Sequence, residues 1–159
     1  MTEQPVVLRD VSGGAGAVCR RLLDLLPAWF EIPDAVDAYV RAADTEPSII
    51  ASAGDVDIGI TTVKLHSAYA AEVHLMAVDP TYRRRGVGRA MLRHLERDLA
   101  SRGIEFLQVK TLSPAHPDAG YAETRAFYLA YGFRPLEEFP TLWDPENPAL
   151  QMIKSVAPD

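Results

Sequence analysis

The sequence predicts an α/β domain built on a mixed sheet (α+β in the order of its elements), and that order carries the prediction. Three consecutive strands are expected in the middle of the chain, and the second half then alternates helix with strand. Consecutive strands favour antiparallel pairing, whereas a strand–helix–strand segment joins parallel neighbours through a right-handed crossover. We expect such a crossover from Ala71 to Lys110. With 159 residues the chain has the length of one domain, and we interpret residues 1–159 as a single domain.

Strands are expected where apolar and β-branched residues run between turn residues. They cover Val6–Asp10, Ser48–Ala53, Ile58–His66, Ala71–Val78, Ile104–Lys110, Arg134–Phe139 and Ala149–Val156. The last two are short, and we expect the proline-rich stretch Pro140–Pro148 between them to be a loop.

Helices are expected where apolar residues recur at helical spacing. They cover Ala15–Leu26, Pro33–Ala43, Val87–Arg102 and Ala122–Tyr131. The third is the clearest, because Met91, Leu92, Leu95 and Leu99 follow its period and Gly103 stands where such a helix ends.

Composition narrows the class of protein. The net charge is −6 and the pI about 5.2, which disfavours a nucleic-acid binder, since such proteins carry a broad basic face. No apolar run reaches the roughly 18 residues that cross a bilayer, and the first residues do not resemble a signal peptide. The single cysteine, Cys19, excludes an internal disulfide. We therefore expect a cytoplasmic protein that engages neither membrane nor nucleic acid.

The one dense basic cluster lies between a strand and the clearest helix. Asp79-Pro80 ends the strand, Arg83-Arg84-Arg85 follows, and Gly86 and Gly88 flank the helix start. Amides at a helix N-terminus lack internal partners, and glycine lets an anion approach them closely. A P-loop is excluded because Arg89-Ala90 stands where Lys and Ser or Thr are needed, and a dinucleotide fingerprint lacks its third glycine. A flexible strand–helix turn with solvated arginines is the alternative; the combined pattern favours a phosphate site.

These residues resemble the coenzyme A motif of the GNAT acetyltransferase superfamily, which has Arg or Gln, two residues, Gly, one residue, and Gly or Ala. Arg83, Gly86 and Gly88 match it. The resemblance implies the family's fold, with mostly antiparallel N-terminal strands, a parallel βαβ cofactor unit and helices on both faces. It also implies acetyl-coenzyme A as cosubstrate. The residues implied to hold it are Met76, Ala77 and Val78 along the strand, and Arg83, Arg84, Arg85, Gly86, Val87, Gly88 and Arg89 at the turn.

A second match lies in the helix before Gly132-Phe133. The family's closing segment has an aromatic residue and Tyr, followed four residues after the Tyr by Gly-Phe, as in Phe127-Tyr128 here. The resemblance implies that Tyr128 protonates the leaving thiolate, and a phenol with pKa ~10 is suited to a thiol of pKa ~8.5. Many members carry an asparagine seven residues earlier, where this chain has Tyr121; Thr124 is the residue we expect to contact the pantetheine in its place.

A base is expected on the strand leading to the turn. Side chains alternate along a strand, so Glu72, His74, Met76 and Val78 should share a face. In several GNAT members a glutamate or histidines at such positions relay a proton through water. Glu72 is the first candidate and His74 the second; an ordinary half-exposed polar face is the other interpretation.

The acceptor side is expected at two segments that border the acceptor in this family. One carries Trp29 and Phe30, the other Trp143, and the acids near them are Glu31, Glu137, Glu138, Asp144 and Glu146. Aromatic walls with acids suit a cationic amine; a solvated acidic surface is the alternative. His66, His94 and His116 lack metal-ligand spacing, so no metal is expected.

The resulting hypothesis is an N-acetyltransferase in which an amine attacks acetyl-coenzyme A directly. A non-enzymatic acyl-coenzyme A sensor and a transferase of a longer acyl group are the alternatives. The acceptor, a small molecule or a peptide, is left open by the residues. Small domains of this family often pair, so a homodimer is compatible with the resemblance.

Overall fold

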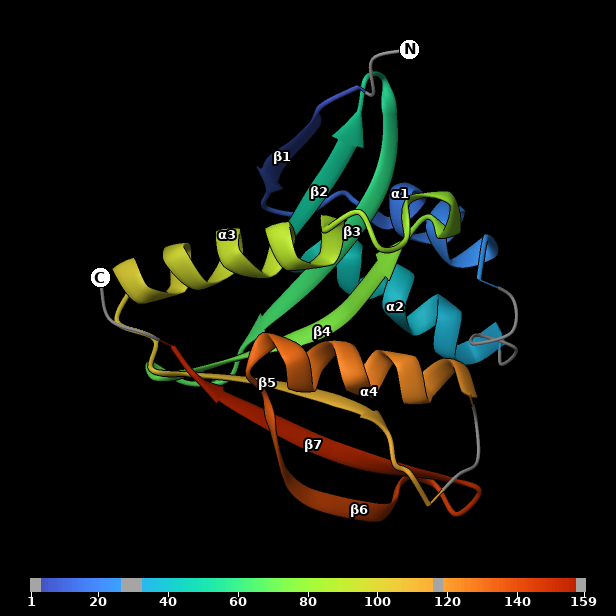
Figure 1. Ribbon diagram of the computed structural model, residues 1–159, viewed down its shortest axis with the longest axis vertical. Coiled ribbons are helices and arrows are strands. Elements are labelled where there is room, and N and C mark those ends of the chain that lie inside the picture. The colour runs from blue at the N-terminus through green and yellow to red at the C-terminus, as the bar shows by residue number, and fades with distance from the viewer. Residues whose placement is uncertain (1–3, 27–32, 116–118, 157–159) are drawn as a thin grey trace. The chain divides into compact units, whose positions relative to one another are not determined.

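The computed structural model describes residues 4–26, 33–115 and 119–156. Over these residues the elements are β1 Val6–Val11, α1 Gly16–Asp24, α2 Pro33–Thr45, β2 Ser48–Ala53, β3 Val56–Leu65, β4 Ala70–Val78, the short 3-10 helix η1 Pro80–Tyr82, α3 Val87–Ser101, β5 Phe106–Leu112, α4 Ala119–Tyr131, β6 Arg134–Asp144 and β7 Asn147–Ser155 (Figure 1). The strand order is β1-β2-β3-β4-β5-β7-β6, and β4 with β5 forms the parallel pair. The predicted mixed α/β fold is confirmed.

The chain divides into two compact units. One comprises Met1–Lys64 with His74–Asp98, and the other Leu65–Val73 with Leu99–Asp159. The division falls within β4 and near the end of α3.

The first unit is an antiparallel sheet with helices on both faces. β2 pairs with β1 and β3 in antiparallel register. Ile50, Ile60, Leu75 and Ala77 form one buried cluster with residues of α1 and α2. On the other face, a Cβ added to Gly59 would lie 3.2 Å from side-chain atoms of Val87 and Met91, which places α3 directly against β3. α3 packs closely against β3 there because residue 59 has no side chain.

The second unit joins β5 to β4 and β7 and adds α4. Four pairs, from Ala70↔Phe106 to Val73↔Val109, set the parallel register, and β7 pairs antiparallel with both β5 and β6. One face of this sheet is mostly buried and is the face that α4 covers; its buried apolar residues include Val73, Leu107, Val109, Leu150 and Met152. The opposite face carries Glu72, Gln108, Lys110 and Gln151.

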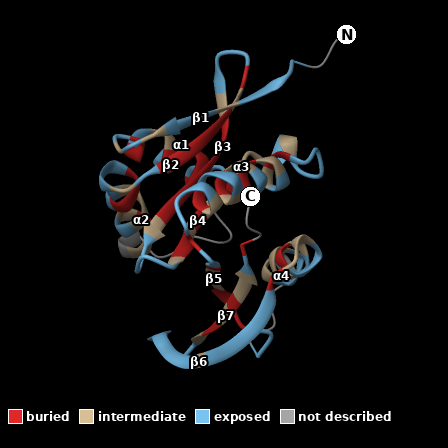
Figure 2. Cartoon of the chain, turned by 90° about the vertical axis from the view of Figure 1, so that its left-hand side faces the viewer, coloured by how far each residue is buried: buried red, intermediate tan, exposed pale blue. Residues whose placement is uncertain are grey.

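One expectation about the end of the chain is wrong. Pro140–Pro148 is not a loop between two short strands, since β6 continues to Asp144 and β7 begins at Asn147. Pro140, Pro145 and Pro148 made the segment resemble a loop because proline cannot donate a ladder hydrogen bond. β6 is the last strand in the order and most of its described side chains are exposed, and an edge strand tolerates proline (Figure 2).

Candidate functional site

The segment between β4 and α3 is a tightly held turn of the first unit. Asp79 caps η1, and its Oδ1 accepts hydrogen bonds of 2.9 Å from both the amide and the hydroxyl of Thr81. The guanidinium of Arg85 lies 5.3 Å from the centre of the Tyr82 ring, a cation–π contact. These contacts set the path of the chain into the three arginines.

Two residues of this turn have left-handed backbone. Arg84 has φ 61° and Gly86 has φ 79°. The left-handed conformation costs a non-glycine residue about 1 kcal/mol, and it persists where the surrounding structure requires it. Turns that mix right- and left-handed residues direct successive amides into one concavity that binds anions. The turn is therefore shaped to accept an anion with its backbone.

The start of α3 adds to the same site. Its first backbone bond, from the amide of Ala90 to the carbonyl of Gly86, measures 2.9 Å, so the preceding amides lie beyond the helical ladder. A Cβ built on Gly86 would meet no atom within 4 Å, and Arg83, Arg84, Arg85 and Arg89 are all exposed. An open glycine, a helix N-terminus and four guanidinium groups fit the charge of a pyrophosphate.

The strand that leads to this turn contains a β-bulge. The amide of His66 donates to the carbonyl of Ala70, and the amide of Asp79 donates to the carbonyl of Ile58. Ala70 and Asp79 are nine positions apart on the β4 side, whereas Ile58 and His66 are eight positions apart on the β3 side. β4 therefore holds one extra residue between the two bonds. Val73 is in regular register with β5, whereas Leu75 and Ala77 share the cluster of Ile60. The extra residue therefore lies at about His74.

The bulge changes the expected alternation of side chains. A bulge redirects the residues that follow it, so Glu72 does not share a face with Met76 and Val78 as the simple alternation predicted. His74 is half-buried, and its ring lies 5.3 Å from that of Tyr39 on α2, at an angle of 54°. Leu75 belongs to the same α1–α2 cluster. Two consecutive side chains thus turn toward α2, as a bulge allows.

Past the bulge β4 no longer follows β5. Their pairing ends at Val73↔Val109, yet β4 continues to Val78. Among the described residues no strand pairing is found on that edge of the strand from Leu75 to Val78. Backbone groups at such an edge can pair with an extended ligand as a neighbouring strand would.

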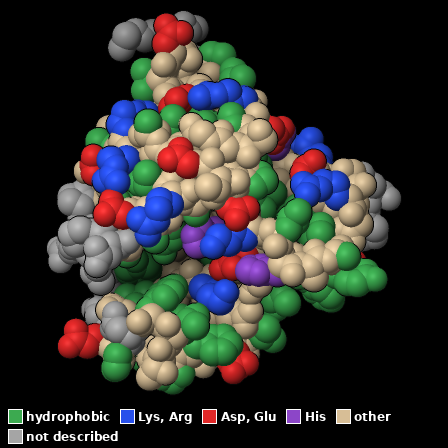
Figure 3. All heavy atoms as spheres, turned by 180° about the vertical axis from the view of Figure 1, so that it is seen from behind, with side chains coloured by type: hydrophobic (Ala, Val, Ile, Leu, Met, Phe, Trp, Pro, Cys, Tyr) green, Lys and Arg blue, Asp and Glu red, His purple; other side chains and the backbone are tan. Residues whose placement is uncertain are grey.

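Glu72 lies in the second unit and is buried. Its Oε1 is 2.6 Å from Nε2 of His66, and its Oε2 is 3.2 Å from Nζ of Lys110. The carboxylate side chain is 9% exposed, against 42% for His66 and 24% for Lys110. A histidine, a carboxylate and a basic group also adjoin one another on the face seen in Figure 3. Each oxygen of a buried carboxylate thus has its own partner.

Tyr128 is held at the end of α4 by a helix cap. Gly132 has φ 128°, and the amides of Gly132 and Phe133 both donate to the carbonyl of Tyr128, at 3.1 and 2.9 Å. This wrapped cap of the Schellman type needs glycine at the left-handed position, which explains the spacing of Gly-Phe after the tyrosine. The Tyr128 side chain is buried, with its ring edge-on to those of Phe127 and Phe133.

Comparison with known families decides the class of this protein. Residues 44–135 match the family model for the acetyltransferase (GNAT) domain. The chain belongs to the GNAT acetyltransferase family. The matched range contains the arginine turn before α3, Glu72 on β4 and Tyr128 on α4.

Two curated proteins are similar to about half of the chain, and one of them is an acetyltransferase. The uncharacterized protein ML0378 of Mycobacterium leprae is 40% identical over 83 residues, which cover 51% of this chain and 21% of the relative. The N-alpha-acetyltransferase RimI of Mycobacterium tuberculosis is 36% identical over 76 residues, which cover 48% of this chain and 42% of the relative. The chain spans less than half the length of the curated relatives that it matches.

Solved structures share the fold. A GNAT-family protein from Desulfovibrio desulfuricans aligns with a TM-score of 0.82 at 19% identity, covering 96% of this chain and 100% of that one. An aminoglycoside 6'-N-acetyltransferase complexed with coenzyme A aligns with a TM-score of 0.72 at 19% identity, covering 96% and 98%. At these identities the likeness concerns the fold.

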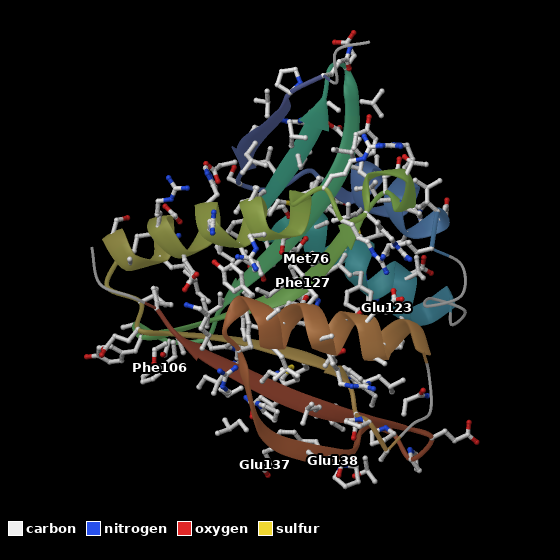
Figure 4. All side chains as sticks on the ribbon, viewed as in Figure 1. Met76, Phe106, Glu123, Phe127, Glu137 and Glu138 are labelled. Atoms are coloured by element: carbon white, nitrogen blue, oxygen red, sulfur yellow. The ribbon has the colours of Figure 1, made fainter. Side chains whose placement is uncertain are left out.

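The remaining expected residues that the structure describes lie in the second unit. Thr124 is half-buried on α4, in the second unit with Tyr128. Trp143 is 45% exposed and lies on β6 rather than in a loop. Trp29 and Phe30 lie outside the described residues. Glu137 and Glu138 are exposed neighbours on β6, and Glu138 accepts a hydrogen bond from the hydroxyl of Ser113 (Figure 4).

Two partners of Glu72 are not predicted by the sequence. The residue type of His66 suggests only a possible metal ligand, whereas the turn after β3 brings it back toward the start of β4. Lys110 was not singled out, because the parallel register that places it beside Glu72 cannot be deduced from the sequence. Within the described stretches, no three His, Cys, Asp or Glu side chains gather as a metal site, and no helix is long and apolar enough to cross a membrane.

Proposed function

We propose that this GNAT domain is an N-acetyltransferase in which an amine attacks acetyl-coenzyme A directly. The arginine turn carries the proposal, because it combines two left-handed residues, a helix N-terminus and four exposed guanidinium groups. This is the donor set for a pyrophosphate, and an aminoglycoside acetyltransferase of the same fold is known with coenzyme A.

The chain offers distinct groups to the two parts of the cosubstrate. The amides of residues 84–89 and the neighbouring arginines would hold the pyrophosphate. The edge of β4 from Met76 to Val78 would pair with the amides of the pantetheine arm, with Thr124 as a side-chain contact. Acetyl-coenzyme A supplies the acetyl group as a thioester, whose leaving group is a thiolate.

Glu72 would take the proton of the acceptor amine. A lysine-like amine with pKa ~10.4 is neutral at pH 7 in only about one molecule in 2,500, a cost of roughly 4.6 kcal/mol. An α-amine near pKa ~7.7 costs about 1 kcal/mol. A buried carboxylate anchored by His66 and Lys110 is a positioned acceptor for this proton. His74, held against Tyr39 at the bulge, is the second candidate.

Tyr128 would protonate the departing thiolate. Its side chain is 5% exposed and its position is fixed by the helix cap and by Phe133. A fixed phenol loses little entropy when it delivers its proton. As the electron pair of the amine forms the new N–C bond, the C–S bond breaks and the sulfur receives the proton of Tyr128.

For the acceptor we propose a cationic amine. Trp143, Glu137 and Glu146 are exposed on the β6–β7 hairpin, and this combination favours a positively charged ligand. RimI, named an N-alpha-acetyltransferase, and the aminoglycoside enzyme point to a protein α-amine and a polyamine-like small molecule as the two acceptor types to compare.

Calorimetry followed by a thiol-release assay tests the proposal. Acetyl-coenzyme A should bind. Release of the thiol should then require one amine from a panel of kanamycin, spermidine, lysine and a peptide with an N-terminal alanine. Binding that gives no release with any amine would favour an acyl-coenzyme A sensor. Binding of longer acyl-coenzyme A esters with faster release would favour a different acyl donor. Absence of binding would contradict the assignment of the arginine turn.

A further inference from the structure

His66 connects a buried carboxylate to solvent. It lies in the turn between β3 and β4, 2.6 Å from Oε1 of Glu72, and its side chain is 42% exposed where that of Glu72 is 9% exposed. The turn is fixed by backbone bonds, since the amides of His66 and Ser67 both donate to the carbonyl of Ala70. The ring therefore spans the distance between an enclosed oxygen and water.

Lys110 secures the other oxygen. Its Nζ lies 3.2 Å from Oε2, and the parallel register of β4 and β5 fixes the two backbones, with Glu72 opposite Gln108. The ammonium group compensates the charge of the carboxylate, which a buried acid needs. The two partners thus have different geometries: Lys110 is on the neighbouring strand, whereas His66 faces solvent.

We propose that His66 is the exit for the proton that Glu72 takes from the acceptor amine, and that Lys110 is a positioning residue for the Glu72 carboxylate. The inference rests on the proposed role of Glu72 as base. It adds a proton path for the reaction and two residues that the family motifs do not contain.

The transfer balances as the movement of one proton. The N–H bond of the amine breaks and the proton passes to the Glu72 carboxylate. His66 accepts it at Nε2 when its ring carries hydrogen on Nδ1, and the resulting imidazolium loses a proton to water. Because the ring is partly exposed, exchange with solvent restores the starting tautomer. Glu72 is then ready for the next turnover.

Other titratable groups lie near the pair in the sequence or in the structure. Lys110 faces Glu72 from β5, while Lys64, Tyr69 and His74 lie within three residues of His66 or Glu72 along the chain. A pH profile alone would combine all of these groups. The test therefore uses chemical rescue, which depends on a vacant imidazole position.

The experiment compares His66→Ala, His66→Gln and a matched control. With the most active amine of the panel, both variants should lower kcat by about tenfold or more, within the range of proton-transfer catalysis. Imidazole added to the buffer should restore the activity of His66→Ala but not that of His66→Gln, whose side chain fills the position. In both variants the dependence of kcat/KM on pH should change on the acidic side of its optimum. Acetyl-coenzyme A affinity, measured by calorimetry, should stay within about twofold.

His94→Ala is the control. His94 also pairs with a carboxylate, with Nε2 3.0 Å from both oxygens of Asp10, but in the first unit. This variant should keep kcat and show no response to imidazole. Wild-type kcat in His66→Ala, or a loss of activity that imidazole does not restore, would overturn the proton exit.

Two further variants separate the parts of the proposal. Lys110→Met should lower kcat without rescue by imidazole, and Lys110→Arg should recover most of it; full activity in Lys110→Met would overturn the positioning role. In Glu72→Gln, the imidazole nitrogen signals of His66 should shift, because a neutral amide replaces the carboxylate partner of the ring, and no amine is needed for that spectrum. If Glu72→Gln keeps full activity, the assignment of the base fails; if it loses activity while His66→Ala keeps it, only the proton exit fails.

Discussion

The rings of Tyr128 and Phe133 meet edge to face, with centroids 5.3 Å apart and planes inclined by 75°. Phe133 is fully buried, and its amide bonds to the carbonyl of Tyr128, so backbone and ring contacts act together. The ring of Tyr128 is thereby held in place by these backbone and ring contacts. A substitution at this position can therefore remove the hydroxyl group while the aromatic ring and its contacts remain.

Tyr128→Phe should keep the ring contact and remove the proton donor. We expect kcat to fall by about 10²–10⁴, with acetyl-coenzyme A affinity and melting temperature nearly unchanged. Steady-state kinetics and calorimetry measure these quantities. Tyr131→Phe, which removes a hydroxyl from the same helix, should retain its kcat. Equal activity of the two variants would exclude Tyr128 from the mechanism.

Gly86→Ala should weaken acetyl-coenzyme A binding more than it weakens the fold. At φ 79° a Cβ is strained, which costs about 1 kcal/mol of stability. Loss of one charge-assisted hydrogen bond to the pyrophosphate would raise Kd about tenfold. Calorimetry and thermal unfolding measure the two effects.

Gly103→Ala is a control with matching geometry. Gly103 also has φ 79°, and a Cβ there also meets no atom within 4 Å, yet it stands at the end of α3 away from the turn. It should lose similar stability and keep its Kd. A similar rise in Kd in both variants would mean that strain, rather than approach of the anion, governs binding.

Cys19 should react slowly with thiol reagents. Burial raises the pKa of its thiol from 9.0 to about 11, and the side chain is fully enclosed in the α1–α2 cluster. The thiolate is the reactive form, so at pH 8 the rate with iodoacetamide should be about a hundredfold lower than in urea-unfolded chain. Because the unfolded thiol ionises first, stability should decrease as pH rises from 9.0 toward 11. Rapid labelling of the folded protein would contradict this burial.

Asp57 should contribute to the acid sensitivity of the fold. Hydrogen bonds from Arg9, at 2.8 and 3.2 Å, lower the pKa of Asp57 from 3.8, and Ser52 donates a further bond of 2.7 Å. A lowered folded-state pKa gives stability that is present above pH 3.8 and is lost as pH falls through the folded value. Asp57→Asn should therefore reduce the fall in melting temperature between pH 5 and pH 2.

Asp37→Asn is the comparison for Asp57. Asp37 pairs with Arg20 at 2.7 Å, with both side chains about half exposed, and exposed pairs contribute little. The melting temperature of Asp37→Asn should therefore lie close to that of the parent protein. An identical acid transition in Asp57→Asn and the parent would contradict the role of the Arg9–Asp57 pair.

The sequence predicted the elements well where local signals agree. The period of Met91, Leu92, Leu95 and Leu99 placed α3 to within a residue at its end, and the turn residues after β2 placed that strand correctly. The arginine turn was recognised because its glycines and charges are contiguous. Such signals depend on neighbours in the chain and need no knowledge of tertiary packing.

Features that depend on register could not be predicted. The extra residue near His74 carries no special residue type, so the alternation expected from Glu72 to Val78 failed. The ion pair of Glu72 with Lys110 requires the parallel register of β4 and β5, which runs from Ala70↔Phe106 to Val73↔Val109. The 32 residues between Val73 and Phe106, which include α3, do not specify this register. The sites of Trp29 and Phe30 stay predictions.

The outer strand β6 has a consequence for behaviour at high concentration. Its pairing with β7 is irregular at Pro135/Glu137 and again between Phe139 and Asp144. Pro135 and Pro140 have no amide hydrogen to donate to an added strand. With the adjacent charges of Glu137 and Glu138, this edge is a poor template for the backbone of another copy. Fibril-like stacking should therefore be disfavoured there, even though Leu136, Leu142 and Trp143 are open to water. Any self-association through β6 would have to use side-chain contacts rather than backbone hydrogen bonds that extend the sheet.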